Sequence, residues 1–277
     1  MIGRNTKIYG VLGQPVRHSL SPAMHNAAFT ALGIDAVYLP MPVDDIGDAI
    51  RGIRALGLAG ASVTIPFKEA VIPHLDSIDA TSRKIGAVNT VRIEETEGGR
   101  FLHGSNTDWI GVIGALREVT TLKDKHVVVL GSGGSARAVG FGLLAAGARL
   151  ALCSRDAHKG QELASRLRCL WAPLTMVDSL RGDILINTTS VGMNSDESLI
   201  QPFTLHHYDV VMDIVYSPLY TCLLRDGTMA GCKVISGLEM LLFQGVAQFE
   251  LWTGKKAPVA AMRQALLDAV ESRGKGE

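Results

Sequence analysis

The chain has 277 residues, and its 27 Lys and Arg balance 27 Asp and Glu, so the formal net charge is zero. That balance gives no support for binding to nucleic acid or acidic membranes, both of which favour a basic protein surface. Apolar residues make up 47% of the chain, which is enough for a sizeable core in one large domain or two modest ones.

Three further features bear on location and metal binding. The four cysteines show no Cys-x-x-Cys spacing, so we expect reduced, mostly buried thiols and no metal site. The N-terminal segment 1–7 lacks the apolar stretch of a signal peptide, and no uncharged apolar run reaches the ~18 residues of a membrane span. We therefore expect a soluble, cytoplasmic protein.

The first half of the chain alternates between strand-like and helix-like segments. Strands are predicted at 7–12, 37–41 and 60–64, and helices at 22–32 and 44–56. Two more strands, at 87–93 and 100–103, are joined by a polar turn and followed by a helix at 108–119. This alternation is typical of an α/β protein with mostly parallel sheets.

The second half repeats the alternation. Strands are predicted at 126–130, 149–153, 183–187, 210–213 and 233–235. Helices are predicted at 138–146, 156–168, 219–230, 237–252 and 258–272.

A glycine-rich segment joins the strand at 126–130 to its helix. Gly131 can make the tight turn, Gly133 lets a phosphate approach the backbone, and Ala136 lets helix and strand pack closely. Backbone N–H groups and the helix N-terminus would surround a pyrophosphate, and Ser132, Gly134 and Ser135 complete this loop. Proteins that bind FAD, NAD or S-adenosylmethionine use similar loops, and a tight turn without a ligand is the alternative.

The end of the next strand bears on the identity of the cofactor. An NAD site usually places an acid there for the ribose 2′-hydroxyl, but here the residues are Ser154 and Arg155, with Lys159 one helical turn later. A guanidinium can bind a 2′-phosphate, which favours NADP. Asp156 is either an acid of the first helical turn or an acceptor for an unphosphorylated ribose, in which case NAD is permitted as well.

These segments predict an α/β fold of two domains around a cleft. Residues 1–107, completed by the C-terminal helices at 238–277, form a substrate-binding and catalytic domain. Residues 108–237 form a Rossmann-type dinucleotide-binding domain.

Seven segments resemble, in order, the motifs of the shikimate dehydrogenase family. They are GQPVRHSLSPAMHN (13–26), VTIPFKE (63–69), GAVNT (86–90), NTD with Gly111, NTTSVGM (187–193), DIVY with Pro218, and the stretch from Gly237 to Gln244. The resemblance implies reversible reduction of 3-dehydroshikimate to shikimate with NADPH, in the pathway to chorismate and the aromatic amino acids. It also implies a small-molecule substrate and two α/β domains flanking a cleft.

The resemblance assigns roles to individual residues. Lys68 would be the proton donor and acceptor, and Asp108 would orient it and the substrate. The other implied substrate-binding residues are Ser19 and Ser21 for the carboxylate, Thr64, Asn89 and Gln244 for ring hydroxyls, and Tyr216, which would close the pocket. Ile214 and Gly237 would join the cofactor-binding residues.

One motif departs from the family pattern. The usual Asn-Arg-Thr is Ser154-Arg155-Asp156 here, so the arginine is kept but an acid replaces the threonine. An acid there resembles the branch that takes NAD or NADP and accepts quinate, whereas Ser21 fits the shikimate-preferring pattern. The alternatives to an NADP-dependent shikimate dehydrogenase are a quinate/shikimate dehydrogenase and a non-catalytic dinucleotide-binding module. The protein is expected to be a monomer or a homodimer.

Several of these residues also have a plainer interpretation. Lys68 follows a strand exit, where partial burial would lower its pKa, but it could be a solvated lysine that opens a helix. Asp108 could be a first-turn helix acid, and Ser21 could be a helix N-cap before a proline. Asn89 could bond the local backbone, and Tyr216 could simply pack.

Overall fold

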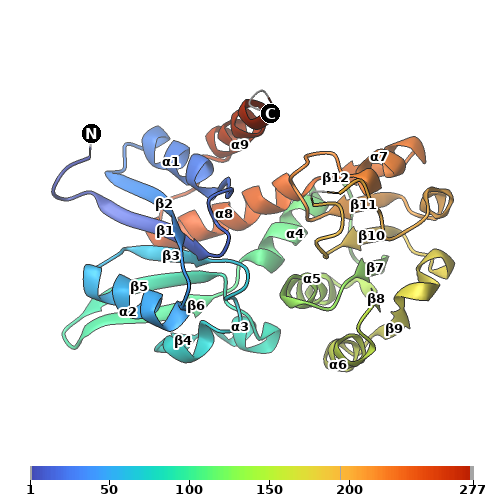
Figure 1. The fold of residues 1–277 in the computed structure, drawn as a ribbon, viewed down its shortest axis with the longest axis horizontal. Coiled ribbons are helices and arrows are strands. Elements are labelled where there is room, and N and C mark those ends of the chain that lie inside the picture. Colours follow the sequence, from blue (N-terminus) through green and yellow to red (C-terminus); the bar gives the residue numbers. More distant parts are fainter. Residues whose placement is uncertain (1, 194, 275–277) are drawn as a thin grey trace. The chain divides into compact units, whose positions relative to one another are not determined.

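The computed structural model describes residues 2–193 and 195–274. The chain divides into two compact units, which are described separately below (Figure 1). Unit 1 comprises Met1–Thr107 and Gln244–Glu277, and unit 2 comprises Asp108–Phe243. Each unit is built on a six-stranded sheet, so both halves have the α/β architecture that the alternating pattern predicts.

The sheet of unit 1 is mixed. Its strands are β1 (Lys7–Gly13), β2 (Ala36–Pro42), β3 (Gly60–Val63), β4 (Ser77–Ile78), β5 (Thr90–Thr96) and β6 (Gly99–Ser105), in the order β2-β1-β3-β5-β6-β4. Strand β1 is parallel to β2 and β3, but β5 is antiparallel to β3 and β6. The pairing of β4 with β6 is also parallel, so most pairings of this sheet are parallel, as predicted, and the tight β5–β6 turn accounts for one of the two antiparallel pairings.

Helices pack on this sheet through apolar faces. They are α1 (Ser21–Ala31), α2 (Ile46–Leu56), α3 (Ala80–Ile85), α9 (Val259–Gly274) and the second half of α8 (Gly237–Thr253), with a short 3-10 turn at Ile72–His74. Ile46, Ile50 and Ile53 share one face of α2 and join the core beside Val63 and Val91.

A second apolar cluster in unit 1 surrounds a buried histidine. His25 of α1 stacks on Tyr38, with ring centroids 4.5 Å apart, and Trp252 of α8 lies 5.3 Å from it. Among the described residues, neither His25 ring nitrogen has a hydrogen-bond partner of normal geometry. Burial lowers the pKa of His25 to about 3, which the nearby Gln248 side chain opposes only in part. His25 is therefore a neutral core residue at neutral pH.

The buried His25 predicts acid-sensitive stability. Its pKa is lower in the folded chain than the ~6.5 of an unfolded histidine, so its contribution is complete above about pH 6.5 and is lost as the pH falls toward 3. We expect the free energy of unfolding to fall by up to about 1.4 kcal/mol per pH unit in this window. Urea unfolding of wild type and His25→Phe between these limits measures the effect, and an equally steep loss in both would contradict it.

The sheet of unit 2 is parallel throughout. Its strands are β7 (His126–Leu130), β8 (Arg149–Ser154), β9 (Leu170–Pro173), β10 (Ile184–Asn187), β11 (Val210–Asp213) and β12 (Lys233–Ile235), in the order β12-β11-β10-β7-β8-β9. Counted within the unit, this is the 3-2-1-4-5-6 order of a Rossmann fold. The strand order reverses between β7 and β10, which places the ligand-binding point of such a sheet at their carboxyl ends.

Helices precede, connect and follow these parallel strands. They are α4 (Asp108–Arg117), α5 (Gly134–Ala145), α6 (Ala157–Leu167), α7 (Cys222–Met229) and the first half of α8, with 3-10 turns at Leu174–Ser179 and Pro202–His207. Helix α5 begins at Gly134 and not at 138 as predicted, because Gly133 acts as its N-cap and two small residues follow. All four cysteines are unpaired, and Cys153 and Cys232 are buried.

Candidate active site

In unit 2, the glycine-rich turn lies at the carboxyl edge of the sheet, where the strand order reverses. Gly131 follows β7 with a φ of 117°, and its N–H donates to the carbonyl oxygen of Cys153 at 2.8 Å. A Cβ at Gly131 would lie 2.6 Å from Oγ1 of Thr188. The backbone angle and the lack of space both require glycine, which confirms the predicted tight turn.

The N-terminus of α5 continues this turn. Gly133 caps the helix without a side-chain hydrogen bond, and no acidic residue lies in the first turn. Among the described residues, nothing lies within 4 Å of a Cβ built at Gly133, so a bulky group can approach the backbone. Because the first N–H groups of a helix lack intrahelical acceptors and the dipole favours an anion, residues 131–135, with the hydroxyls of Ser132 and Ser135, fit a pyrophosphate.

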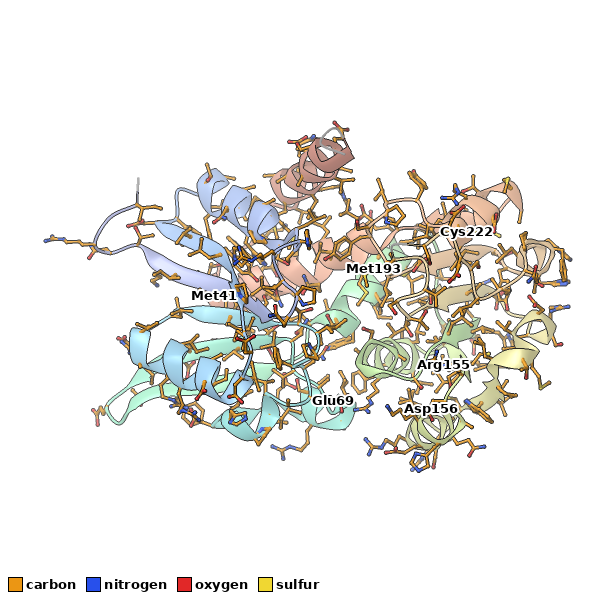
Figure 2. The ribbon with its side chains drawn as sticks, in the orientation of Figure 1. Met41, Glu69, Arg155, Asp156, Met193 and Cys222 are labelled. Atoms are coloured by element: carbon orange, nitrogen blue, oxygen red, sulfur yellow. The ribbon has the colours of Figure 1, made fainter. Side chains whose placement is uncertain are left out.

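The residues that would bind the ribose lie between β8 and α6 (Figure 2). The Ser154 hydroxyl is buried, donates to the carbonyl oxygen of Asp156 at 3.1 Å and accepts from Nε1 of Trp171 at 3.0 Å. These two hydrogen bonds of Ser154 hold the turn between β8 and α6 on its buried side. Arg155 and Lys159, in contrast, are exposed. Two exposed cations beside a helix N-terminus suit a 2′-phosphate.

Asp156 is the N-cap of α6, one position before the first turn in which the plainer interpretation places it. Its Oδ1 accepts from the N–H of Lys159 at 3.0 Å. Threonine, the usual family residue here, is also a good N-cap. The acid therefore performs the same structural task as threonine, and the difference between them is one negative charge beside Arg155.

A buried polar network, which the sequence motifs alone do not reveal, holds the loops after β10 and β11. Asp213 is fully buried; its Oδ1 accepts from Nδ2 of Asn187 at 2.9 Å and from the N–H of Val215 at 3.0 Å, and its Oδ2 accepts from Oγ1 of Thr221 at 2.7 Å. Burial raises the pKa of Asp213, and these hydrogen bonds oppose the rise. Both Asn187 and Asp213 end parallel strands at the ligand-binding edge, and this shared register is the signal that could have found them.

Two predicted cofactor residues meet at the same edge. A Cβ built at Gly237 would lie 2.2 Å from the carbonyl oxygen of Ile214 and 2.8 Å from that of Val215. Real Cβ atoms do not approach backbone this closely. The loop after β11 can therefore pack against the start of α8 only because residue 237 is glycine.

Gly237→Ala is expected to destabilise the chain by about 1–3 kcal/mol, because the new methyl group forces backbone atoms apart. The same displacement of Ile214 should raise the Kd for NADP. Urea unfolding and cofactor titration measure both effects. Gly52→Ala is the matched control: it lies within α2 with open space around it, so alanine there should add about 0.5–1 kcal/mol. A Gly237→Ala protein as stable as wild type would contradict the close-packing argument.

In unit 1, four segments with predicted substrate residues gather at one edge of the sheet. The parallel strands β1 and β3 end there, β5 begins there and β6 ends there. The N–H of Thr64 donates to the carbonyl oxygen of Leu12 at 2.9 Å, and the N–H of Asn89 donates to that of Ser105 at 3.1 Å. Segments that are far apart in the sequence are thus hydrogen-bonded side by side.

Lys68 lies at this edge, half-buried, in the turns that follow β3. Its carbonyl oxygen accepts from the N–H of Val88 at 2.8 Å, which anchors it beside Asn89. No helix starts at Lys68, since the next helical turn begins at Ile72. The part of the plainer interpretation in which Lys68 opens a helix is therefore wrong.

Asn89 precedes β5 and is part of a dense hydrogen-bond cluster. Its Oδ1 accepts from the N–H of Thr107 at 2.8 Å and from Oγ1 of Thr90 at 2.7 Å. Its Nδ2 donates to Oγ1 of Thr107 at 3.0 Å and to Oε1 of Gln244 at 3.4 Å. The structure therefore brings Asn89 and Gln244 together, although 155 residues separate them.

The two serines lie at the start of α1. Leu20 is the N-cap, and Ser21 is already helical, so the interpretation of Ser21 as N-cap is wrong. Oγ of Ser19 instead accepts from the N–H of Ser21 at 3.2 Å. Helix α1 thus begins one residue before the predicted position 22, with Pro22 in its first turn.

Two predicted substrate residues belong to unit 2. Asp108 is the first residue of α4, where it is buried with the helix dipole in its favour. Tyr216 lies half-buried in the loop after β11, beyond the Asp213 network.

Two findings concern membrane-spanning helices and metal sites among the described residues. No helix in residues 2–193 and 195–274 is both long enough and apolar enough to span a membrane. In the same part of the chain, no group of three His, Cys, Asp or Glu side chains is arranged to hold a metal ion.

Comparison with known proteins places the chain in a family. The model of the shikimate dehydrogenase substrate binding domain matches residues 11–91, and that of the shikimate 5′-dehydrogenase C-terminal domain matches residues 237–267. A shikimate dehydrogenase (NADP+) of Pyrococcus abyssi is 43% identical, with 98% of this chain and all of the relative covered.

Solved structures agree. A shikimate 5-dehydrogenase from Thermus thermophilus, in complex with NADP(H) and shikimate, has a TM-score of 0.87 and 35% identity, with 95% of this chain and all of that chain covered. A Listeria monocytogenes shikimate 5-dehydrogenase in complex with shikimate and NAD has a TM-score of 0.85 and 32% identity, over 96% and 98% of the two chains. Full-length identity, both family models and both sheets lead to the same assignment: the chain belongs to the shikimate dehydrogenase family of NADP-dependent oxidoreductases.

Proposed function

We propose that the chain catalyses the reversible, NADP-dependent interconversion of 3-dehydroshikimate and shikimate. Residues 1–107 with 238–277 would bind the substrate, and residues 108–237 would bind the cofactor. The observation that carries this proposal is the gathering of Thr64, Lys68 and Asn89 at one sheet edge in unit 1. A dinucleotide-binding module without catalysis would need no such lysine.

The cofactor would be held by residues whose geometry fits it. The turn 131–135 offers backbone donors to the pyrophosphate, Arg155 and Lys159 offer charge to the 2′-phosphate, and Ile214 and Gly237 line the same edge. When bound, NADPH supplies the hydride for reduction of a ring ketone.

The substrate would be held by the residues of unit 1 together with Asp108 and Tyr216. Ser19 and Ser21 would bind the carboxylate, Thr64, Asn89 and Gln244 the ring hydroxyls, and Tyr216 would cover them. Lys68 would give a proton to the carbonyl oxygen during reduction and take it back during oxidation. Asp108 would accept from a substrate hydroxyl and orient Lys68.

The choice of cofactor can be tested at Asp156. Threonine keeps the N-cap and removes the charge, so Asp156→Thr isolates the electrostatic effect. A charge about 4 Å from a phosphate costs ~1 kcal/mol even in water, so we expect the kcat/KM ratio of NADP to NAD to rise about fivefold. Asp156→Asn, which also caps well, is the matched control and should behave alike. An unchanged ratio in both variants would remove Asp156 from cofactor selection.

A quinate/shikimate dehydrogenase that uses NAD is the second candidate, and the acid at position 156 is the observation that favours it. Steady-state kinetics with the four pairs of NADP or NAD and shikimate or quinate separate the two candidates. A kcat/KM for NADP and shikimate above the other three supports the first. No turnover with any pair would overturn both.

The proposal includes a cytoplasmic enzyme that acts as a monomer or a homodimer. Light scattering of the purified chain distinguishes these oligomeric states. A larger assembly would contradict this part of the proposal without affecting the catalytic part.

A further inference from the structure

Gln248 lies in α8, one helical turn after Gln244, and is buried among polar groups of unit 1. Its Nε2 donates to Oγ1 of Thr90 at 2.9 Å and to the backbone carbonyl oxygen of Asn89 at 3.3 Å. Its Oε1 accepts from Oγ of Ser62 at 2.9 Å. One amide therefore joins the helix to two strands.

The orientation of this amide is fixed. A backbone carbonyl can only accept, so the group that faces the Asn89 carbonyl must be the NH₂ of Gln248. Its oxygen then faces Ser62, and Ser62 must donate to it. Each hydroxyl has a single proton, so the bonds between Ser62 and Tyr38 and between Thr90 and Asn89 also have a defined direction.

One branch leads to the side chain of Asn89. Thr90 accepts from Gln248, so its proton goes to Oδ1 of Asn89, at 2.7 Å. Since Oδ1 also accepts from the N–H of Thr107, the oxygen of Asn89 is occupied from two sides. The Asn89 amide is thereby oriented with its NH₂ toward Thr107 and Gln244, a predicted substrate residue.

The other branch leads to α1. Ser62 donates to Gln248, so it accepts the Tyr38 proton, at 2.6 Å. Tyr38 is fully buried, its pKa is raised by that burial, and Ser21 is a further hydrogen-bond partner of its hydroxyl. The network therefore begins and ends at predicted substrate residues, Asn89 and Ser21, while Gln248 lies at its centre.

We propose that Gln248 is a positioning residue for the substrate: it sets the orientation of the Asn89 amide through Thr90 and holds Ser21 in register through Ser62 and Tyr38. This rests on the proposed function. Gln248 is almost fully buried and all three of its hydrogen bonds are to residues of unit 1, so its loss should affect the KM for shikimate far more than that for NADP.

Gln248→Glu and Gln248→Met in the full chain test the proposal. An ionised Glu can still accept from Ser62 but places a second acceptor against the Asn89 carbonyl. We expect the KM for shikimate to rise about tenfold, the effect of one buried polar group left without its partner, with the KM for NADP unchanged. Met removes all three bonds and should raise the KM for shikimate at least as much.

The pH dependence of Gln248→Glu supplies a readout that loss of packing would not change. Buried glutamates can have pKa values of about 8–9, and a protonated Glu can donate to either Oγ1 of Thr90 or the Asn89 carbonyl, which restores one of the two bonds that Gln donates. The KM for shikimate should therefore recover in part from about pH 9 to about pH 6 in Gln248→Glu but not in Gln248→Met. The neighbouring titratable groups are His25, with a pKa of about 3, and Tyr38, with a raised pKa, so neither changes charge in this range.

Gln264→Glu is the matched control, since Gln264 is exposed on α9 and contacts only Asp268 among the hydrogen bonds described. It should behave as wild type at every pH. A KM for shikimate in both Gln248 variants equal to that of wild type, or an equal rise of both KM values, would overturn the positioning role. A wild-type chain that does not turn over shikimate would instead overturn the proposed function.

Discussion

Replacing Lys68 with alanine is expected to lower kcat for shikimate oxidation by about 10²-fold or more, the usual contribution of a positioned acid–base group. Lys68 is half-buried at the edge where β3 ends and β5 begins, and its backbone is anchored to Val88. The backbone bond survives the substitution, so the folded structure should be retained. The loss should therefore appear in kcat, with little change in the KM for NADP.

Two further measurements distinguish lost chemistry from lost structure. Lys84→Ala, at an exposed lysine in the last turn of α3, should leave kcat unchanged. A small primary amine added to Lys68→Ala should restore part of the activity, because it supplies the missing proton donor. A Lys68→Ala enzyme with wild-type kcat would remove Lys68 from the mechanism and leave the proton donor to another residue.

Local pattern was enough to predict the glycine-rich turn after β7. A run of β-branched residues followed by Gly131 and Gly133 is compatible with few backbone conformations. The positive φ of Gly131 and the unobstructed N-terminus of α5 at Gly133 both require residues without a side chain. The α/β architecture of unit 2 with parallel strands was predicted from the same alternation. The start of α5 was placed too late because glycine and serine are weak helix formers, and the Gly133 cap overrides that preference.

The polar networks could not be predicted in this way. Asn89 and Gln248 are buried polar residues whose partners are separated from them by up to 186 residues in the sequence, and no local pattern reports such contacts. The short elements β4, α3 and β9 were missed for a related reason. They have two, six and four residues, too few for a hydrophobic period to show.

Asp213 is the buried charge on which the loops after β10 and β11 depend. Asp213→Ala removes the acceptor of the Val215 N–H, the Asn187 amide and the Thr221 hydroxyl at once. Each buried donor without an acceptor costs about 1–3 kcal/mol, so a loss of about 3 kcal/mol or more is expected on urea unfolding. The loop that carries Ile214 should loosen as well, with a higher Kd for NADP.

Asp213→Asn separates the hydrogen bonds from the charge. Asparagine keeps one acceptor oxygen, and the Thr221 hydroxyl can turn to accept from its NH₂, so this variant should be far more stable than Asp213→Ala. Because burial raises the pKa of Asp213 in the folded chain, the wild type gives up stability as the pH rises from about 4 through that raised value. The free energy of unfolding of the asparagine variant, which does not titrate, should therefore rise relative to that of wild type as the pH rises.

Asp209→Ala, at an exposed carboxylate of the same unit, is the control and should change neither stability nor the Kd for NADP. Equal stability of Asp213→Ala and wild type would show that the loops are held by packing and not by this network.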